Sequence, residues 1–266
     1  MSQPPESPKV SLFVTCVVDQ FYPEIGESTV RVLRRLGVDV DFPSAQTCCG
    51  QPAFNSGFWS EAIPLARGFL KTFAGDRYIV APSGSCASMV RVFYEELLHD
   101  EPDLLEKARA VAPRVFEFSE FVVDVLGVTD LSPFVGQTGD ASDRNVTYHE
   151  GCHLRRELGV TTQPTALIEG LPGVQLTEME QVDVCCGFGG TFAVKFSDIS
   201  TAMLQDKIGY VQATGADTVV SCDATCLMQI GGGLELNGVD VRPVHLAQLI
   251  DERIGIESGI SRAQPR

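Results

Sequence analysis

The sequence predicts an α/β protein made of two pseudo-repeated parallel-sheet domains, each with a Cys-Cys-Gly motif at the carboxyl edge of its sheet. Short apolar, β-rich runs alternate with segments of helical periodicity, which is the pattern of a parallel sheet covered by helices. Cysteines follow several of these runs, and Cys48-Cys49-Gly50 recurs as Cys185-Cys186-Gly187. We therefore expect domains at residues 9–128 and 145–256, joined by a polar linker within residues 129–145.

The first half shows the alternation most clearly. An apolar run ends at Cys16, a second precedes the Cys48-Cys49 pair, and a third leads through a Pro-Ser-Gly-Ser turn to Cys86. Apolar residues at helical spacing separate the runs, and glycines stand where helix C-caps are expected. The predicted strands are residues 10–15, 38–42, 78–81 and 115–118, and the predicted helices are residues 25–36, 60–73 and 119–126, with another beginning at Cys86.

The second half repeats this order. Predicted strands at 146–152, 218–221 and 241–244 precede Cys152, Cys226 and a final helix at 245–250. A shift of 137 residues superposes the two Cys-Cys-Gly motifs and places Trp59-Ser60-Glu61 on Phe196-Ser197-Asp198. Agreement a full turn beyond the cysteines indicates an internal duplication.

Composition narrows the function. With 35 acidic and 20 basic residues the 266-residue chain has a net charge of -15, which excludes nucleic acid or an anionic membrane as the main partner. No run reaches the roughly 18 apolar residues of a membrane span, and residues 1–8 lack the features of a signal peptide and are expected to form a short tail. We therefore expect a cytoplasmic protein, in which nine cysteines indicate metal or redox chemistry.

The cysteines form two sets of similar spacing. Adjacent cysteines bond to each other only with strain, whereas adjacent thiolates suit a metal cluster. Four thiolates could hold a cubane iron-sulfur cluster or a tetrahedral zinc ion, and a fifth cysteine in the second half favours iron-sulfur there. The first cysteine set is Cys16, Cys48, Cys49 and Cys86; the second cysteine set is Cys152, Cys185, Cys186 and Cys226, with Cys222 as the fifth candidate.

The histidines and other motifs add less. His153 could be a ligand, a donor to a sulfur ligand or a surface residue, and His149 is interpreted as structural. His245 is expected to cap or pack against the last helix, and His99 to lie at the surface. No dinucleotide fingerprint or phosphate-binding loop is present, and a Cys152-His153 nucleophile is disfavoured because sequence neighbours usually diverge in space.

These motifs together resemble the cysteine-rich, or CCG-domain, iron-sulfur proteins, and most of all the lactate-utilisation branch of that family. The family includes subunits of heterodisulfide reductases, of an unusual class of succinate dehydrogenase and of glycolate oxidase. The resemblance covers about residues 10–250. It rests on residues 47–55, Ser83-Gly84-Ser85-Cys86, residues 149–155, residues 185–192 and Cys226-Leu227-Met228.

The resemblance implies an electron-transfer subunit of a cytoplasmic complex that oxidises L-lactate to pyruvate. It implies a ferredoxin-like iron-sulfur subunit and a third small subunit as partners, and one or two 4Fe-4S clusters held by the eight cysteines of the two sets. The chain would then be a non-autonomous part of an oxidoreductase that does not use NAD.

The family pattern closes each motif with Cys-x-x-Cys, and this chain departs from it. Ser83 and Asp223 stand where the first of those cysteines is expected, and Cys222 comes one residue early. The departure favours a four-cysteine cluster. Two alternatives stay open: a thiol-disulfide redox subunit like those of heterodisulfide reductases, and a scaffold subunit of an oxidoreductase complex with zinc in the first set.

Overall fold

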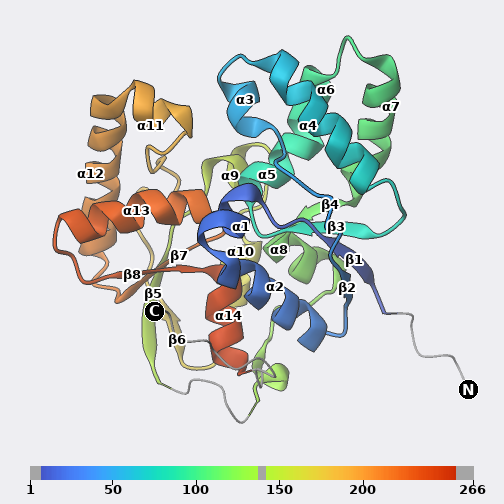
Figure 1. Ribbon diagram of the computed structural model, residues 1–266. Helices are drawn as coiled ribbons and strands as arrows, with labels where there is room; N and C mark the ends of the chain where they lie inside the picture. Colours follow the sequence, from blue (N-terminus) through green and yellow to red (C-terminus); the bar gives the residue numbers. More distant parts are fainter. Residues whose placement is uncertain (1–6, 137–141, 256–266) are drawn as a thin grey trace, which may run out of the picture.

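Two four-stranded parallel sheets form the frame of the protein (Figure 1). The computed structural model describes residues 7–136 and 142–255. The strand orders are β2-β1-β3-β4 and β6-β5-β7-β8, so the predicted class and the duplication are confirmed. The strands are β1 (Lys9–Leu12), β2 (Asp39–Asp41), β3 (Tyr78–Ala81), β4 (Val115–Glu117), β5 (Arg144–Tyr148), β6 (Val174–Leu176), β7 (Thr218–Ser221) and β8 (Arg242–His245).

Helices connect the strands of each sheet. Several of the helices, among them those at 102–111 and 163–169, and strand β6 lie outside the predicted elements. Two predicted helices contain π-helical turns, at Met89–Phe93 and Phe121–Val125. The helices are α1 (Cys16–Phe21), α2 (Pro23–Arg35), α3 (Gln51–Asn55), α4 (Trp59–Thr72), α5 (Gly84–Ser88), α6 (Tyr94–Leu97), α7 (Pro102–Val111) and α8 (Phe118–Glu120) in the first half, and α9 (Cys152–Arg156), α10 (Gln163–Glu169), α11 (Thr191–Lys195), α12 (Ser197–Ala213), α13 (Ala224–Leu236) and α14 (Leu246–Ile254) in the second.

Some predicted segments fall outside the described residues. These are most of the N-terminal tail, the middle of the linker (residues 137–141) and the last position of the second predicted domain. In the part of the chain that the structure covers, no helix is both long and apolar enough to cross a membrane.

Hydrogen bonds fix which residues of the two halves correspond. Phe13 donates its backbone N–H to the carbonyl of Val80, and His149 donates to that of Val220, so Phe13 and His149 occupy equivalent positions after β1 and β5. The helices that follow the Cys-Cys-Gly motifs do not keep the predicted shift, because Phe58 caps α4 and Phe196 caps α12. The segment between the Cys-Cys-Gly motif and α12 is one residue longer than the segment between the first motif and α4, so helix α12 is displaced by one residue against the expected register.

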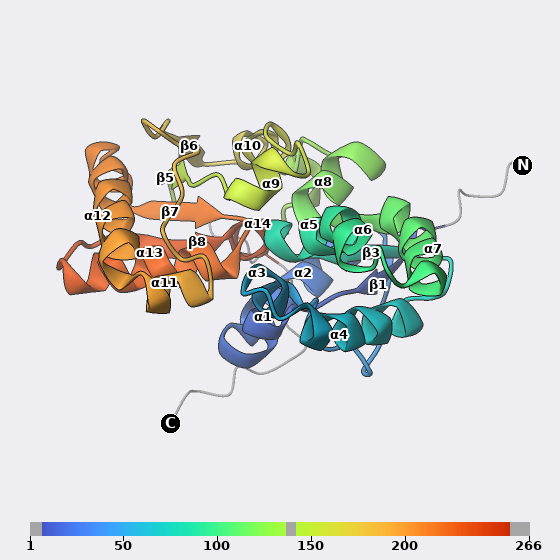
Figure 2. The ribbon, with the colours of Figure 1, turned by 90° about the horizontal axis from the view of Figure 1, so that it is seen from above.

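The two halves pack around a pseudo-twofold axis. Helix α14 packs on α2, and the equivalent contact on the other side of the axis is that of α8 with α10. In the same way, the contact of α9 with α5 is equivalent to that of α1 with α13. One buried core joins both sheets across this interface, and the views in Figures 1 and 2 show α5 and α9 side by side between the halves. The approach is close: a Cβ on Gly84 would lie 2.6 Å from Cβ of Leu154, so a side chain there would push the halves apart.

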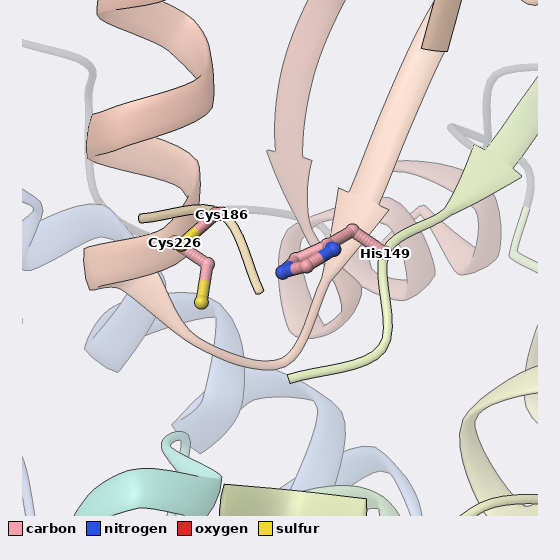
Figure 3. Close-up of side chains that lie close together, drawn as sticks. All are labelled: His149, Cys186 and Cys226. Atoms are coloured by element: carbon pink, nitrogen blue, oxygen red, sulfur yellow. The ribbon is translucent and has the colours of Figure 1, made fainter. Parts of the chain in front are cut away.

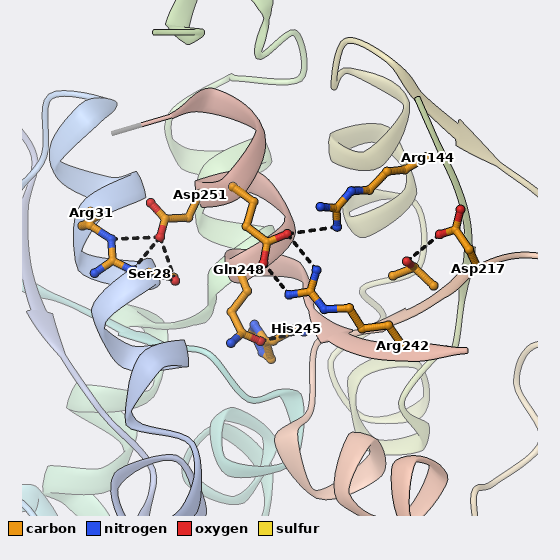
Figure 4. Close-up of polar contacts among 10 residues, drawn as sticks. Ser28, Arg31, Arg144, Asp217, Arg242, His245, Gln248 and Asp251 are labelled. Atoms are coloured by element: carbon orange, nitrogen blue, oxygen red, sulfur yellow. Dashed lines mark hydrogen bonds and ion pairs between the residues drawn. The ribbon is translucent and has the colours of Figure 1, made fainter. Parts of the chain in front are cut away.

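Polar contacts orient the halves as well (Figure 4). The Asp251 carboxylate on α14 accepts hydrogen bonds from Ser28 at 2.8 Å and from the Arg31 guanidinium at 2.6 and 2.8 Å. At the equivalent contact, the Gln163 amide at the start of α10 donates at 2.9 Å to the carboxylate of Asp124, which lies in the π-helical turn that follows α8. A charged contact in one place therefore corresponds to a contact with a neutral donor in the other.

Candidate metal centre

Both cysteine sets lie at the carboxyl edge of a sheet, as the sequence predicts. Cys16 begins α1 directly beyond β1, and Cys86 lies in α5 beyond β3; Cys152 and Cys226 hold the same places beyond β5 and β7. In each sheet these two strands are the neighbours between which the strand order reverses, the position at which open α/β sheets bind ligands. The fold therefore brings each set together at a binding position.

One cavity joins the two sets. It has a volume of about 190 Å³ and lies between the halves. Residues from both halves line it, including Thr15, Gln51, Asn55, His153 and Asp223. Its cysteine lining consists of Cys16, Cys49, Cys86, Cys152, Cys185, Cys186 and Cys226.

The first cysteine set forms two close pairs. The sulfurs of Cys16 and Cys48 are 3.6 Å apart, and those of Cys49 and Cys86 are 3.4 Å apart. Gly50 donates its N–H to the sulfur of Cys48 at 3.4 Å from a backbone with φ of 91°, a conformation that favours glycine. Hydrogen bonds from Cys16 and Cys49 lower the pKa of Cys48 to about 3, whereas the bond to Cys48 and burial raise that of Cys16. The Cys48 thiolate is therefore stabilised by the S–H groups of Cys16 and Cys49.

The second set repeats this arrangement and adds a histidine. Gly187 donates to the sulfur of Cys185 at 3.4 Å, and hydrogen bonds from Cys152 and Cys186 lower the pKa of Cys185. Ligand atoms of His149, Cys186 and Cys226 lie within 4.8 Å of one another, and Figure 3 shows the imidazole pointing toward both sulfurs. Over the residues that the structure describes, no other trio of such groups is this close.

His149 is buried without a hydrogen bond. It is 1% exposed, and neither ring nitrogen has a hydrogen-bond partner among the described residues. Leaving a buried polar group unpaired costs roughly 1–3 kcal/mol. Burial, and then the charge of Lys207, lower the pKa of His149 to about 3, so the ring is neutral and has one free lone pair. The prediction of a structural residue does not account for these unpaired nitrogens.

Lys207 is a second buried polar residue near this set. It is fully buried, and its ammonium donates to the carbonyls of Gln181 at 2.9 Å and Val182 at 3.2 Å, in the loop before Cys185. Burial lowers its pKa, and the negative charge of Cys186 opposes the shift. In the first half Phe69 holds the equivalent position in α4, and nothing in the residue pattern around Lys207 signals that the lysine is buried.

Ser83 and Asp223 occupy equivalent positions and bond to each other. They form an isolated antiparallel bridge, and the Asp223 carboxylate accepts from the hydroxyls of Ser83 at 2.7 Å and Ser85 at 2.8 Å. Burial raises the pKa of Asp223. The two residues that replace expected cysteines therefore serve the contact between the halves.

Cys222 and the remaining histidines lie elsewhere. Cys222 is fully buried in the core between the halves, where the Tyr148 hydroxyl donates to its sulfur at 3.7 Å, and it does not line the cavity. His153 lines the cavity and lies 3.6 Å from Glu157. His245 caps α14, as the sequence allows, and the exposed His99 pairs with Asp100.

The donors fit a soft metal ion or cluster. Each set offers four sulfurs, one of which is favoured as thiolate by hydrogen bonds from neighbouring cysteines and from a glycine N–H, and the second set adds an unpaired imidazole. Fold and site therefore define a duplicated α/β protein with two thiolate-rich donor sets facing one cavity.

Comparison with known proteins identifies the family. The model of the cysteine-rich CCG domain matches residues 10–91 and 146–231. The chain is 43% identical to lactate utilization protein A of Halalkalibacterium halodurans, over 92% of this chain and 97% of that protein, and 42% identical to the Bacillus subtilis protein of that name, over 92% and 100%. The chain belongs to the CCG cysteine-rich family that includes these proteins.

The fold also occurs in a solved structure of another protein. A hypothetical protein from Helicobacter pylori superposes with a TM-score of 0.61 at 9% identity, covering 97% of this chain and 52% of that one. At this identity the similarity concerns the fold alone.

Proposed function

We propose that this chain is an iron-sulfur electron-transfer subunit of a cytoplasmic complex that oxidises L-lactate to pyruvate. The observation that carries the proposal is the single cavity lined by cysteines of both sets. Relatives that match almost the whole chain are named lactate utilization protein A, which supports lactate as the substrate of the complex.

The ligands would come from both halves. Cys16, Cys48, Cys49 and Cys86 would hold one 4Fe-4S cluster, and Cys152, Cys185, Cys186 and Cys226 a second one. A cluster bound in this way supplies one-electron transfer. Cys222 has no place in either ligand set, because it faces Tyr148 in the core.

Other groups of the chain would stabilise the negative charge of the thiolate ligands at both sites. The N–H groups of Gly50 and Gly187 stabilise thiolates, and the buried Lys207 places a positive charge beside the second set. The cavity keeps the two sets close, so that an electron can pass between them without crossing bulk solvent. Lactate oxidation releases two electrons and two protons, which we assign to the complex with a ferredoxin-like subunit and a third small subunit.

Two other functions have a specific observation in their favour. A cavity open to both sets could admit a disulfide between them, which would make the chain a thiol-disulfide redox subunit. The close sulfur pairs of the first set favour zinc there, since tetrahedral coordination at about 2.3 Å places sulfurs about 3.8 Å apart. In that case the first half would be a metal-bound scaffold.

The test is metal analysis of protein purified without oxygen. We expect about four irons and four sulfides per cysteine set. In the reconstituted complex, Cys185→Ser with Cys186→Ser should remove the metal of the second set and lower lactate oxidation by more than about 100-fold, beyond the effect of losing an outer-sphere contact. Cys222→Ala is the matched control and should keep both metal and activity.

Other outcomes separate the alternatives. Zinc without sulfide in the first set would establish the scaffold there, and reduction of disulfides without lactate oxidation would establish the thiol-disulfide function. Full lactate oxidation by the Cys185→Ser, Cys186→Ser protein would overturn the proposal.

A further inference from the structure

We propose that His149 supplies a nitrogen ligand to the metal centre of the second cysteine set, beside Cys186 and Cys226. The proposal rests on the proposed function only in requiring that this set binds a metal centre. It assigns to the second half a donor that the first half does not possess.

The geometry places the imidazole where a ligand must be. A ring nitrogen of His149 and the sulfurs of Cys186 and Cys226 lie within 4.8 Å of one another, and the ring points toward the sulfurs (Figure 3). His149 follows β5 directly, and its backbone N–H bonds to the Val220 carbonyl, which anchors the residue at the carboxyl edge of the sheet. The side chain is therefore held in place by the same edge that positions Cys226.

The imidazole has no other polar function there. Neither ring nitrogen bonds to any described residue, although the ring is 1% exposed. The nearby Lys207 ammonium donates to the carbonyls of Gln181 and Val182. A neutral imidazole is a good ligand for iron and zinc, so metal coordination satisfies a nitrogen that the protein leaves unpaired.

In the first half, the position equivalent to His149 is occupied by an apolar residue that only packs against its neighbours. Phe13 is the equivalent residue, and its ring lies 4.9 Å from that of Phe69, edge to face. Asp223, the carboxylate that lines the cavity, is already bonded to Ser83 and Ser85. His149 therefore raises the donor count of the second centre to five, against four in the first.

The experiment is pulsed electron paramagnetic resonance on full-length protein purified without oxygen, with histidine labelled with ¹⁵N. The first set is disabled by Cys48→Ser with Cys49→Ser, so that only the second centre contributes. The centre is measured in its reduced state; if the metal is zinc, cobalt(II) replaces it as the probe. We expect a ¹⁵N coupling of the size of a directly bound nitrogen. It should disappear in His149→Phe, the residue of the first half, and persist in His153→Gln.

The outcomes separate this proposal from the previous one. Metal in the second set without a histidine coupling, with a coupling too weak for a direct bond, or with one that disappears in His153→Gln overturns the role of His149 and leaves the proposed function standing. A second set that binds no metal overturns both. The labelled parent protein gives the answer even if His149→Phe does not fold.

Discussion

The two halves have their cysteines in equivalent positions but differ in the residues that pack next to those cysteines. In the first half Phe13, Phe69 and Phe73 pack ring against ring, and the Tyr94 hydroxyl bonds to the carbonyl of Cys49. In the second half His149 and Lys207 take the places of Phe13 and Phe69. Duplication thus preserved the positions that could hold a metal, while the residues that set its electrostatic surroundings diverged. The two centres should differ more in chemical properties than in shape.

The largest expected effect concerns two helix caps at equivalent positions, Glu117 before α8 and His245 before α14. Burial raises the pKa of Glu117 to about 8 and lowers that of His245 to about 4. Because the folded-state pKa of Glu117 is raised, the free energy of unfolding falls as the pH rises from about 4.5 to about 8. Because the folded-state pKa of His245 is lowered, the free energy of unfolding falls as the pH drops from about 6.5 to about 4. The caps therefore have opposite pH windows.

Urea unfolding of reduced, metal-free protein across this range measures both windows. Glu117→Gln should remove the loss at high pH, and His245→Gln the loss at low pH, each on the order of a few kcal/mol. The same pH dependence in wild-type and Glu117→Gln protein would contradict the prediction for the first half.

A smaller effect is expected from Lys207, the charged residue behind the second set. A unit charge acting over about 10 Å through an effective dielectric of about 20 contributes about 1–2 kcal/mol, or roughly 40–90 mV for one electron. Lys207→Met removes a positive charge that favours the reduced, more negative centre. The reduction potential of the second centre should therefore fall by this amount in a titration followed by paramagnetic resonance.

The matched control is Lys195→Met, which removes the same charge from an exposed position. Solvent screening should keep its effect below about 10 mV. Equal shifts in the two variants would show that net charge, rather than the buried position, determines the potential.

The smallest expected effect compares the two helix contacts between the halves. The Arg31–Asp251 contact is partly buried, so a double-mutant cycle with Arg31→Met and Asp251→Asn should give a coupling of about 1 kcal/mol. The Gln163–Asp124 hydrogen bond at the equivalent contact is exposed, and the corresponding cycle should give about half of that coupling. A larger coupling for Gln163–Asp124 would reverse the assignment of the stronger contact.

The two sheets and the convergence of the cysteines could be predicted from the sequence, because the spacing of apolar residues and the order of the strands determine both. Parallel strands share one carboxyl edge, so cysteines that follow β1, β3, β5 and β7 must converge there. The short edge strand β6 and helix α7 carry little periodic signal and were not predicted. The offset of α12 arises from one additional residue between the Cys-Cys-Gly motif and the helix, which the pattern of apolar residues does not reveal.

Site residues were predictable to the extent that their chemistry appears in the sequence itself. Cys222 has the residue type and nearly the spacing of a ligand, but its position after β7 directs it into the core toward Tyr148. His149 and Lys207 show the reverse: their types are ordinary, and their burial becomes visible only after the halves are folded. Unpaired nitrogens are a property of three-dimensional packing, so sequence reasoning could not find them.

The bond between Ser83 and Asp223 has a consequence for the ancestry of the chain. On a true twofold axis of a homodimer, every residue would face its own copy, so two carboxylates or two hydroxyls would meet there. A serine that donates to an aspartate requires the two positions to mutate independently, which two copies of one gene product do not allow. The buried pair therefore records a change that followed the duplication of the ancestral half, and a homodimer of either half alone could not reproduce this contact.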